Sequence, residues 1–536
     1  MDEFDFLIIG SGFGGSVSAC RLAQKGYSVA VLEKGREFKD HEFPKSNWNI
    51  GRFLWAPFIK CFGIQSITVL KNLMVLHGVG VGGGSLVYAN TLLRPEDDVL
   101  NKLPWPKSFL NGDKLTSHYS TAEKMLGVKE NIFLEENDEE IRSLSKALGC
   151  EATFKPTQVG VLMSESLGEN VKDPYFDGDG PDRTTCTKCG GCMIGCRVGA
   201  KNTLVKNYLY FARKWGAIIY PNTQVDMIRP DGDGYVVFSK RPGRFFLKEK
   251  RVFKAKKVIL SAGVMGTIDL LFKNRDEYRT LPNISNALGL NIRTNGESLV
   301  GATSFESHRE LSRGIAIGAQ IKPDEHTKIE GVRYPVGSDF MKLLTIPLTP
   351  KGSRVKRPFY MLKSLIASFP KFTRMILSSG WANRSMILLV MQSVDTKLKF
   401  HYKRTFFKGF SKGLVGDLGS ETMETSIPVA QEAARILSKN IEGMPLNCSV
   451  EAGLGSVATA HILGGAVLGD DKDLSVVNDK NEVHGHPGLY ICDASIIPGN
   501  LAVNPSLTIT ALAEKFSSEF INKDESIKNR EIRFSN

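Results

Sequence analysis

The sequence of 536 residues lacks several features that would define its class at once. It has no internal repeat and no low-complexity tract, and its 42% hydrophobic and 24% charged residues are typical of a globular protein. No apolar run reaches the roughly 18 to 20 residues of a membrane-spanning helix. The chain opens on acidic residues rather than on the basic and apolar regions of a secretory signal. We therefore expect a cytoplasmic protein whose membrane contact, if it has one, is peripheral and at the inner membrane face.

Cysteine is scarce, with nine in the chain, and disulfides are not expected in a reducing compartment. Four of the nine lie within a loop at 184–198 and have the spacing C-x2-C-x2-C-x3-C: Cys186, Cys189, Cys192 and Cys196. Bacterial ferredoxins hold iron–sulfur clusters with this spacing, although they usually have proline after the last cysteine, where this chain has Arg197. The loop therefore predicts an iron–sulfur cluster, with a four-cysteine zinc site and four reduced thiols as the alternatives.

Acidic residues are absent from 340–394, within a chain whose net charge is +12. The segment RPFYMLKSLIASFPKFTRMIL (357–377) mixes basic and bulky apolar residues at roughly helical spacing. This pattern favours a helix that lies on a membrane surface. The alternative is a helix whose apolar side covers a cavity. Nucleic acid is not an expected partner, because no recognition module accompanies the basic charge.

The first 35 residues have the pattern of a strand, a turn, a helix and a second strand. Gly10, Gly12 and Gly15 form G-x-G-x-x-G directly after an apolar run, and Glu33 ends the second strand. In such a motif the first glycine permits a tight turn, the second lets the backbone approach a pyrophosphate, and the third lets helix and strand pack closely. An acid at this distance is suited to a ribose diol. The segment predicts a dinucleotide-binding fold.

Two further segments fit a bound dinucleotide. The sequence LHGVGVGGGSLVYANTLLRPED (76–97) is rich in glycine, so its backbone can lie flat against a ligand. Near the C-terminus, GLYICDAS predicts a strand that ends at Asp493, and NPSLTITALAEKF predicts a helix with Asn504 as N-cap and Pro505 as its first residue.

Together these motifs resemble the glucose–methanol–choline (GMC) family of FAD oxidoreductases, and within it the cholesterol oxidase-like branch. The resemblance is carried in order by GVGGGSLV (80–87), LPNISNALGLNIRTNGE (281–297), HILGGAVLG (461–469) and VNPSLTITALAE (503–514). Tyr88 and Val79 depart from the branch pattern, which has Asn and Arg there.

The resemblance implies an α/β protein with a discontinuous Rossmann-type FAD-binding domain and an α+β substrate domain built on an antiparallel sheet. We assign the FAD-binding domain to 1–100, 200–300 and 455–536, and the substrate domain to 101–199 and 301–454. The implied FAD contacts are Gly10, Gly12, Gly14, Gly15, Glu33, Gly83, Gly84, Ser85, Val225, Ala262, Gly263, Asp493, Asn504 and Pro505.

The resemblance also implies the reaction, which is oxidation of a hydrophobic alcohol by hydride transfer to flavin N5. A sterol-like 3β-hydroxyl is the expected substrate, and oxygen can accept the electrons. His461 and Asn504 match the residues that hold the hydroxyl, and Glu330 matches the glutamate that moves the steroid double bond. Without the resemblance, His461 reads as a core histidine and Glu330 as an exposed acid on a surface strand.

Two alternatives stay open at the level of sequence. In the first, the protein is an FAD dehydrogenase of another alcohol or sugar that passes electrons through an iron–sulfur centre to a quinone or protein acceptor. In the second, it is a non-catalytic, membrane-associated lipid-binding flavoprotein.

Overall fold

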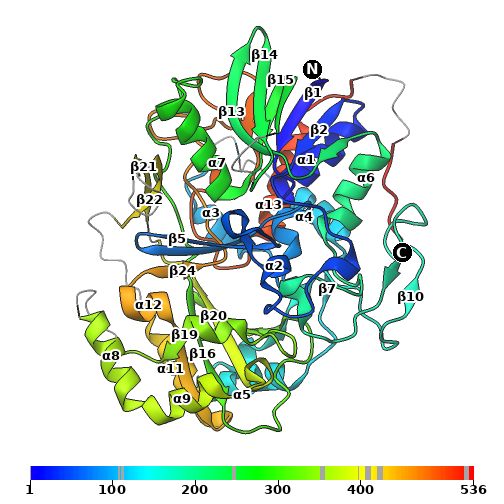
Figure 1. Ribbon diagram of the computed structural model, residues 1–536. Coiled ribbons are helices and arrows are strands. Elements are labelled where there is room, and N and C mark those ends of the chain that lie inside the picture. Colours follow the sequence, from blue (N-terminus) through cyan, green and yellow to red (C-terminus); the bar gives the residue numbers. More distant parts are fainter. Residues whose placement is uncertain are drawn as a thin grey trace.

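The structure is a computed structural model with two large sheets at opposite ends of the molecule and a small third sheet between them (Figure 1). The residues that it describes are 2–106, 109, 114–243, 249–350, 356–395, 397–404, 412–418, 427–523 and 530–535.

The first large sheet is built around the N-terminal strand, which is buried from Phe4 to Ile9, as expected for an inner parallel strand. This strand, β1, pairs in parallel with β2 and β15, and β15 pairs in parallel with β25. An antiparallel extension, β14 and β13, completes one side. The strand order is β12 (Ile218–Tyr220), β2 (Val29–Leu32), β1 (Asp2–Ile9), β15 (Lys250–Leu260), β14 (Gly234–Lys240) and β13 (Gln224–Asp231). The seventh strand, β25 (Leu489–Ile491), pairs with β15 outside this order.

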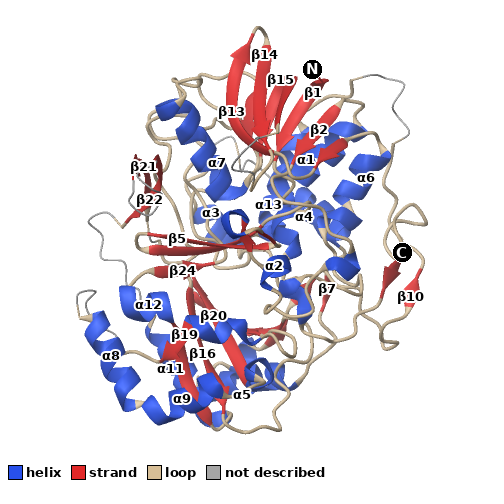
Figure 2. Ribbon diagram, viewed as in Figure 1, coloured by secondary structure: helices blue, strands red, loops and turns tan. Residues whose placement is uncertain are grey.

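Helices from distant parts of the chain pack beside this sheet (Figure 2). They are α1 (Phe13–Gln24), α4 (Lys114–Leu126), α6 (Tyr208–Lys214), α7 (Gly263–Phe272) and α13 (Ser506–Ser518). Helix α1 directly follows the first strand and the glycine motif, and it contacts α6 and α13.

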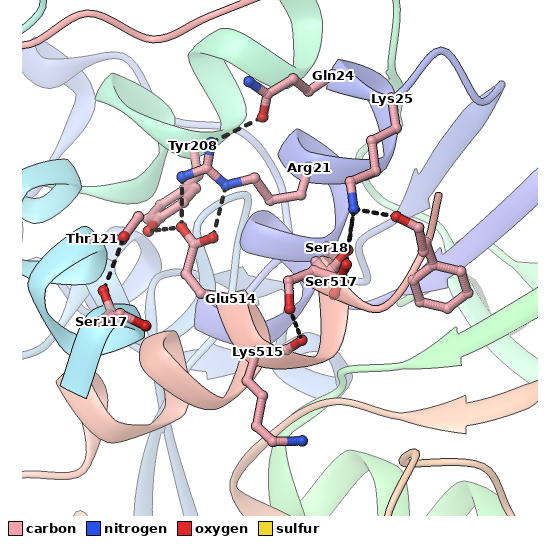
Figure 3. A network of polar contacts seen from close by, with 12 residues as sticks. Ser18, Arg21, Gln24, Lys25, Ser117, Thr121, Tyr208, Glu514, Lys515 and Ser517 are labelled. Atoms are coloured by element: carbon pink, nitrogen blue, oxygen red, sulfur yellow. Dashed lines mark hydrogen bonds and ion pairs between the residues drawn. The ribbon is translucent and has the colours of Figure 1, made fainter. Parts of the chain in front are cut away.

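A buried polar network fastens three of these helices together (Figure 3). Arg21 of α1 donates two hydrogen bonds to the carboxylate of Glu514 on α13, at 2.7 and 2.8 Å. The hydroxyl of Tyr208 on α6 donates to the same carboxylate at 2.6 Å. A bidentate arginine–carboxylate pair is geometrically specific, so the network fixes how α13 lies against the helix that follows the glycine motif.

The second large sheet is antiparallel throughout its described pairings. In order its strands are β19 (Thr345–Pro347), β23 (Gly443–Cys448), β16 (Ser298–Ser304), β20 (Ser385–Gln392), β18 (Thr327–Val332), β17 (Ile317–Ile321) and β8 (Lys155–Pro156). Helices α5 (Glu136–Ala147) and α11 (Pro428–Asn440) pack on it, and their apolar residues share a buried cluster with β16, β18 and β20.

The third sheet connects the two halves. It consists of β24 (Val457–Thr459), β6 (Leu73–Gly78) and β5 (Gln65–Leu70), with β24 parallel to β6 and β6 antiparallel to β5. Short elements complete the described fold: β3 (Trp55–Ala56) with β4 (Cys61–Phe62), β7 (Lys129–Glu130) with β9 (Gln158–Val159), β10 (Asn170–Val171) with β11 (Arg183–Thr184), β21 (Lys399–Arg404) with β22 (Lys412–Asp417), α2 (Ile50–Phe53) and α3 (Asp97–Lys102).

The predicted fold class is confirmed. A Rossmann-like sheet with flanking helices is joined to an α+β part built on an antiparallel sheet. The residue boundaries assigned to the two domains stay a prediction.

The basic stretch 340–394 differs from the single interfacial helix expected for 357–377. It contains β19, α8 (Arg357–Ala367), α9 (Phe369–Leu377), α10 (Trp381–Arg384) and β20, while 351–355 lie outside the described residues. Pro370 stands in the first turn of α9, where proline is tolerated, whereas in the middle of a longer helix it would remove a hydrogen bond and clash with the preceding turn. No helix among the described residues is long and apolar enough to span a membrane.

Candidate active site

A cavity of about 630 Å³ runs between the first sheet and the second. Its walls come from the glycine motif, from the β5–β6 hairpin, from the start of α7 and α13, and from the inner strands of the second sheet. The predicted FAD contacts at its wall are Gly10, Gly12, Gly14, Glu33, Gly83, Gly84, Val225, Ala262, Gly263, Asp493, Asn504 and Pro505, and His461 also lines it. Segments as far apart as residues 9 and 509 therefore meet around one space.

The glycine motif has the shape that a dinucleotide needs. Gly10 has φ +101°, and a Cβ atom there would lie 2.3 Å from the carbonyl oxygen of Ser261. A Cβ atom on Gly15 would lie 2.1 Å from the carbonyl oxygen of Gly10, whereas one on Gly12 would meet nothing within 4 Å. Gly10 and Gly15 thus permit the turn and the close packing, and Gly12 leaves room for a pyrophosphate against its backbone. These residues fit FAD.

Glu33 lies at the cavity wall, as predicted, but its carboxylate already accepts several hydrogen bonds from the protein. It accepts hydrogen bonds from the backbone and hydroxyl of Ser11 at 3.1 and 2.8 Å, from Gly35 at 2.8 Å and from Gly80 at 3.4 Å. A carboxylate has about four acceptor positions. Glu33 therefore organises the loops around the motif, and its contact with a ribose diol stays a prediction.

The second glycine cluster lies against the first. A Cβ atom on Gly83 would approach the Cα atom of Gly12 to 2.6 Å, so the two loops meet without side chains between them. Ser85 is fully buried outside the cavity wall, where it donates to the carbonyl of Gly82 at 2.7 Å and accepts from the backbone of Leu204 at 3.1 Å. Ser85 thus holds the loop in shape.

Asp493 lies at the end of β25, where the sequence predicts it. Its carboxylate accepts from the backbone and hydroxyl of Ser495 at 2.9 and 2.6 Å, and from the hydroxyl of Thr267 on α7 at 2.6 Å. Burial raises the pKa of Asp493, and these hydrogen bonds partly offset that effect. The residue joins the end of the sheet to the helix that lines the cavity beside Ala262 and Gly263.

The predicted N-cap of the last helix is wrong by one residue. Helix α13 begins at Ser506, and Pro505 rather than Asn504 is its N-cap residue. The side chain of Asn504 makes no capping bond, because its amide donates to Oε2 of Glu330 at 3.2 Å instead. The start of α13 still lines the cavity through Pro505 and Ser506.

His461 and Asn504, the two residues predicted to hold the substrate hydroxyl, both line the cavity. Each is held by a buried glutamate. Nδ1 of His461 is hydrogen-bonded to Oε1 of Glu297, whose side chain is fully buried. Asn504 is bonded to Glu330, which is also fully buried. Four polar side chains from different parts of the chain thus form two bonded pairs, and one member of each pair lines the cavity.

Two polar atoms in this group are buried and have no partner within the described part of the chain: Oε1 of Glu330 and Oδ1 of Asn504. A buried polar atom without a hydrogen bond is costly, so both are suited to a ligand or a water molecule. Burial raises the pKa of Glu330 to about 7, against the lowering effect of Lys328 and of the Asn504 amide. Glu330 is therefore a buried carboxyl that exchanges its proton near neutral pH, and not the exposed acid of the alternative interpretation.

Burial by itself lowers the pKa of His461, but the charge of Glu297, its hydrogen bond and the charge of Glu330 outweigh burial, so the pKa is raised. Both glutamates favour the charged imidazole.

The part of the cavity wall that the second sheet contributes is apolar. The second sheet contributes Leu299, Ile317, Val332, Ile387 and Leu389, and nearby loops contribute Met193, Tyr334 and Met341. A large apolar surface with a few converging polar groups at one end is typical of a site for a small hydrophobic molecule.

The four predicted metal ligands lie in one loop, where Cys192 and Cys196 pack against the buried cluster that contains Cys186. Among the described residues, no group of three or more His, Cys, Asp or Glu side chains is placed to hold a metal ion. Cys186 is buried, Cys189 is exposed, and Cys192 and Cys196 are partly buried. Burial raises the pKa of Cys192 to about 11, so it is a thiol at neutral pH. Metal binding by this loop stays a prediction for metal analysis of the purified protein.

The cysteine loop does have a clear place in the site. Its central turn, Gly191–Ile194, contributes Met193 to the cavity wall. The buried ammonium of Lys201 donates to the carbonyls of Cys192, Leu86 and Tyr88 at 2.7, 3.0 and 2.9 Å. Lys201 thus ties the cysteine loop to the glycine-rich loop, next to the residue that faces the cavity.

Sequence reasoning missed Glu297, Met193 and Lys201. Glu297 lies inside a segment that resembles the family, but 164 residues separate it from His461, and no spacing rule connects them. Met193 lies within the cysteine motif, and the interpretation of that motif as a metal site gives no reason to expect Met193 at the cavity. A lysine after a cysteine motif gives no signal of burial, because most lysines are exposed.

Comparison with known proteins agrees with this architecture. Residues 421–513 match the family model "GMC oxidoreductase", and residues 8–38 match "NAD(P)-binding Rossmann-like domain". The chain is 41% identical to a cholesterol oxidase of Acinetobacter baumannii, over 96% of this chain and 94% of that protein. It is also 41% identical to a cholesterol oxidase of Mycobacterium tuberculosis, over 98% of this chain and 92% of that protein.

A solved structure shares the fold at low identity. The pyridoxine 4-oxidase of Mesorbium loti superposes with a TM-score of 0.62 at 14% identity, covering 96% of this chain and 99% of that one. The identity to the two cholesterol oxidases over nearly the whole length is the stronger finding. The chain therefore belongs to the GMC oxidoreductase family, in the cholesterol oxidase-like branch, and is an FAD-dependent oxidoreductase of alcohols.

Proposed function

We propose that this protein oxidises the 3β-hydroxyl of a sterol-like alcohol. One observation carries the proposal: His461 and Asn504, each bonded to a buried glutamate, line the same cavity as the apolar side chains of the second sheet. Bound FAD supplies the acceptor for the hydride that leaves the carbinol carbon. We propose that the first sheet and its helices, at 1–100, 200–300 and 455–536, hold FAD, and that 101–199 and 301–454 hold the substrate.

His461 and Asn504 hold the hydroxyl oxygen. Nδ1 of His461 faces Glu297, so Nε2 is the nitrogen available to the substrate. Neutral His461 accepts the hydroxyl proton at Nε2 as the carbonyl forms. The amide nitrogen of Asn504 donates one hydrogen to Glu330. Its second amide hydrogen can donate to the substrate oxygen, so Asn504 positions the oxygen whose proton goes to His461.

Glu330 has a second role in the proposal. Oxidation of a sterol with a neighbouring double bond gives a ketone in which a carbon lies between the carbonyl and that double bond. The carboxylate of Glu330 removes a proton from this carbon and returns it at the far end of the double bond, which leaves a conjugated ketone and no net change in protons. The pKa of about 7 suits a group that must both accept and donate.

Oxygen is the electron acceptor that we propose, with hydrogen peroxide as the second product. The substrate class is tested by steady-state turnover with a 3β-hydroxysteroid, its 3α epimer and a long-chain primary alcohol. The proposal predicts turnover and peroxide with the 3β compound, and a loss on the order of 10²-fold or more when His461 is replaced by glutamine. Equal turnover of both epimers, or a preference for the linear alcohol, would overturn the sterol assignment.

We further propose that the surface of α8 and α9 is where the protein meets the membrane that holds its substrate. The large apolar side chains Phe359, Leu362, Ile366, Phe369 and Leu377 are 54–80% exposed. These helices lie at the lower left edge of the molecule in Figure 1, at the opposite end from the first sheet. Placing each such side chain in an apolar phase contributes roughly 1–2 kcal/mol.

The charge of the same surface points to anionic lipid. Lys356, Lys363, Lys371 and Arg374 are exposed there, and the sequence has no acid between 340 and 394. Each basic side chain near an anionic membrane contributes about 1 kcal/mol. We name Phe359, Leu362, Ile366, Phe369 and Leu377, with these four basic residues, the α8–α9 surface.

Sedimentation with vesicles tests this partner. The wild-type protein should bind vesicles that contain phosphatidylglycerol more tightly than vesicles of phosphatidylcholine alone. Changing Phe359 and Ile366 to serine should weaken binding to the anionic vesicles about 10-fold or more. The matched control is Leu474→Ser, because Leu474 is 70% exposed and lies outside the α8–α9 surface. Equal losses in both variants, or unchanged binding in the first, would contradict the assignment.

A further inference from the structure

Glu297 is a buried carboxyl group that contacts the predicted catalytic histidine directly. Its side chain has no exposed surface, whereas that of His461 is 16% exposed. We propose that Glu297 is the positioning residue of His461: it fixes the imidazole with Nδ1 protonated and Nε2 facing the substrate, and it stabilises the imidazolium formed when the substrate loses its proton. The inference rests on the proposed role of His461 as base.

Several hydrogen bonds hold the two residues in register. The second carboxylate oxygen of Glu297 accepts from the backbone of Ala460 at 2.8 Å. The hydroxyl of Thr459 accepts from the backbone of His461 at 2.9 Å and donates to the carbonyl of Thr294 at 3.2 Å. The segments around 294–297 and 459–461 are thus held together, so the backbone of His461 stays beside Glu297 and the imidazole is within reach of the carboxylate.

The hydrogen bond to Glu297 decides which ring nitrogen carries the proton. An ionised carboxylate only accepts, so the proton of the neutral imidazole resides on Nδ1. The lone pair then lies on Nε2, where it can take the hydroxyl proton. In hydrolytic triads a buried carboxylate directs a histidine base in the same way.

The charged groups that shift the pKa of His461 are both negative. Glu297 contacts it directly, and Glu330 acts from the Asn504 side. Because an adjacent negative charge favours the imidazolium, the two glutamates strengthen His461 as a base. Glu297 has the larger effect, since it also forms the hydrogen bond.

The test compares Glu297→Gln with the wild type and with a matched control. Glutamine has the same shape but no charge, and its amide can donate to Nδ1, which moves the histidine proton to Nε2. The control is Glu451→Gln, because Glu451 is also buried, with a pKa raised to about 8 mainly by burial. Its carboxylate accepts from Ser298 and Leu299, at 3.0 and 3.1 Å, and not from His461.

The first measurement is the pH dependence of anaerobic flavin reduction in a single turnover, with whichever alcohol reduces the enzyme. The wild-type rate should rise with pH as His461 loses its proton. In Glu297→Gln the rate near neutral pH should fall on the order of 10²- to 10⁴-fold. The half-maximal pH of the remaining activity should be lower by about one unit or more, because the opposing charge is lost. Glu297→Asp should recover part of the rate, and Glu451→Gln should leave the profile unchanged.

The second measurement needs no substrate. NMR of protein labelled at histidine Cε1 gives the pKa of His461, identified by its absence in His461→Gln. A lower pKa in Glu297→Gln, with Glu451→Gln unchanged, supports the inference even if the substrate class proves different. An unchanged histidine pKa and an unchanged pH profile in Glu297→Gln would overturn it. So would equal effects of the two glutamine variants.

Discussion

The amide of Asn504 donates to Glu330 over 3.2 Å, which joins the chain just before the last helix to a strand of the second sheet 174 residues earlier. Oδ1 of Asn504 and Oε1 of Glu330 are buried and have no hydrogen-bond partner among the described residues. The residue that positions the substrate oxygen and the residue that moves a proton are thus directly connected.

Replacing Glu330 by glutamine should separate the two steps of the proposed reaction. Oxidation depends on His461 and should persist within about 10-fold, whereas formation of the conjugated ketone should fall on the order of 10²- to 10⁴-fold. The unconjugated ketone should accumulate and is identified by chromatography. Loss of both steps in equal measure would instead make Glu330 part of the oxidation.

The same residue gives a pH dependence with a definite sign. Since burial raises the pKa of Glu330 from 4.5 to about 7, the carboxyl is neutral below that value and charged above it. Conjugation requires the carboxylate, so its rate should rise as the pH passes through about 7.

Stability should respond to Glu330 in the opposite direction. The folded protein holds this proton more tightly than the unfolded chain, so its free energy of unfolding should decrease between about pH 4.5 and pH 7. Glu330→Gln should lose this part of the dependence. Denaturant unfolding at several pH values measures it, and identical pH dependence in both proteins would contradict the prediction.

Two glycine substitutions should have different consequences. Gly12→Ala places a methyl group in open space within the cavity, so the protein should fold but bind FAD at least about 10-fold more weakly. Gly15→Ala places one 2.1 Å from a backbone oxygen, which should destabilise the fold itself by more than about 1 kcal/mol. Fluorescence titration of apoprotein with FAD and thermal unfolding distinguish them. Normal FAD affinity in Gly12→Ala would contradict the placement of the pyrophosphate beside Gly12.

The network of Arg21, Tyr208 and Glu514 should contribute to stability (Figure 3). Glu514→Ala leaves the arginine without its carboxylate partner, and breaking a buried pair in this way costs about 3–5 kcal/mol. Because the Arg21 side chain is 15% exposed, we expect a loss near about 3 kcal/mol. The matched control is Glu519→Ala in the same region. Glu519 pairs with Lys515, but the Glu519 side chain is exposed, and such a pair contributes about 0–1 kcal/mol to the free energy of unfolding. Equal losses measured by denaturant unfolding would contradict the assignment.

Met193 should influence which alcohols the enzyme accepts. Met193→Trp adds bulk to the apolar wall, so KM for a sterol should rise about 10-fold or more while a short alcohol is affected less. The change tests whether the cysteine loop shapes the substrate cavity. A uniform fall in kcat for all alcohols would indicate damage to the polar end instead.

The sequence predicts the cofactor end of the site better than the substrate end. The glycine motif, Glu33 and Asp493 follow local rules of strand, turn and helix, and all three lie at the cavity. Glu330 is predicted through the resemblance alone. The bonds of His461 to Glu297 and of Asn504 to Glu330 span 164 and 174 residues, and no local rule predicts such pairings. Asn504 shows where local rules fail. Asparagine is a favourable N-cap residue, but here its side chain bonds to the distant Glu330 instead.

The most direct test of the proposed function is an anaerobic absorption spectrum of the purified protein before and after one equivalent of a 3β-hydroxysteroid. Flavin absorption should bleach with the 3β compound and return when oxygen is admitted, with formation of peroxide. A flavin spectrum that the steroid leaves unchanged would contradict the proposed function.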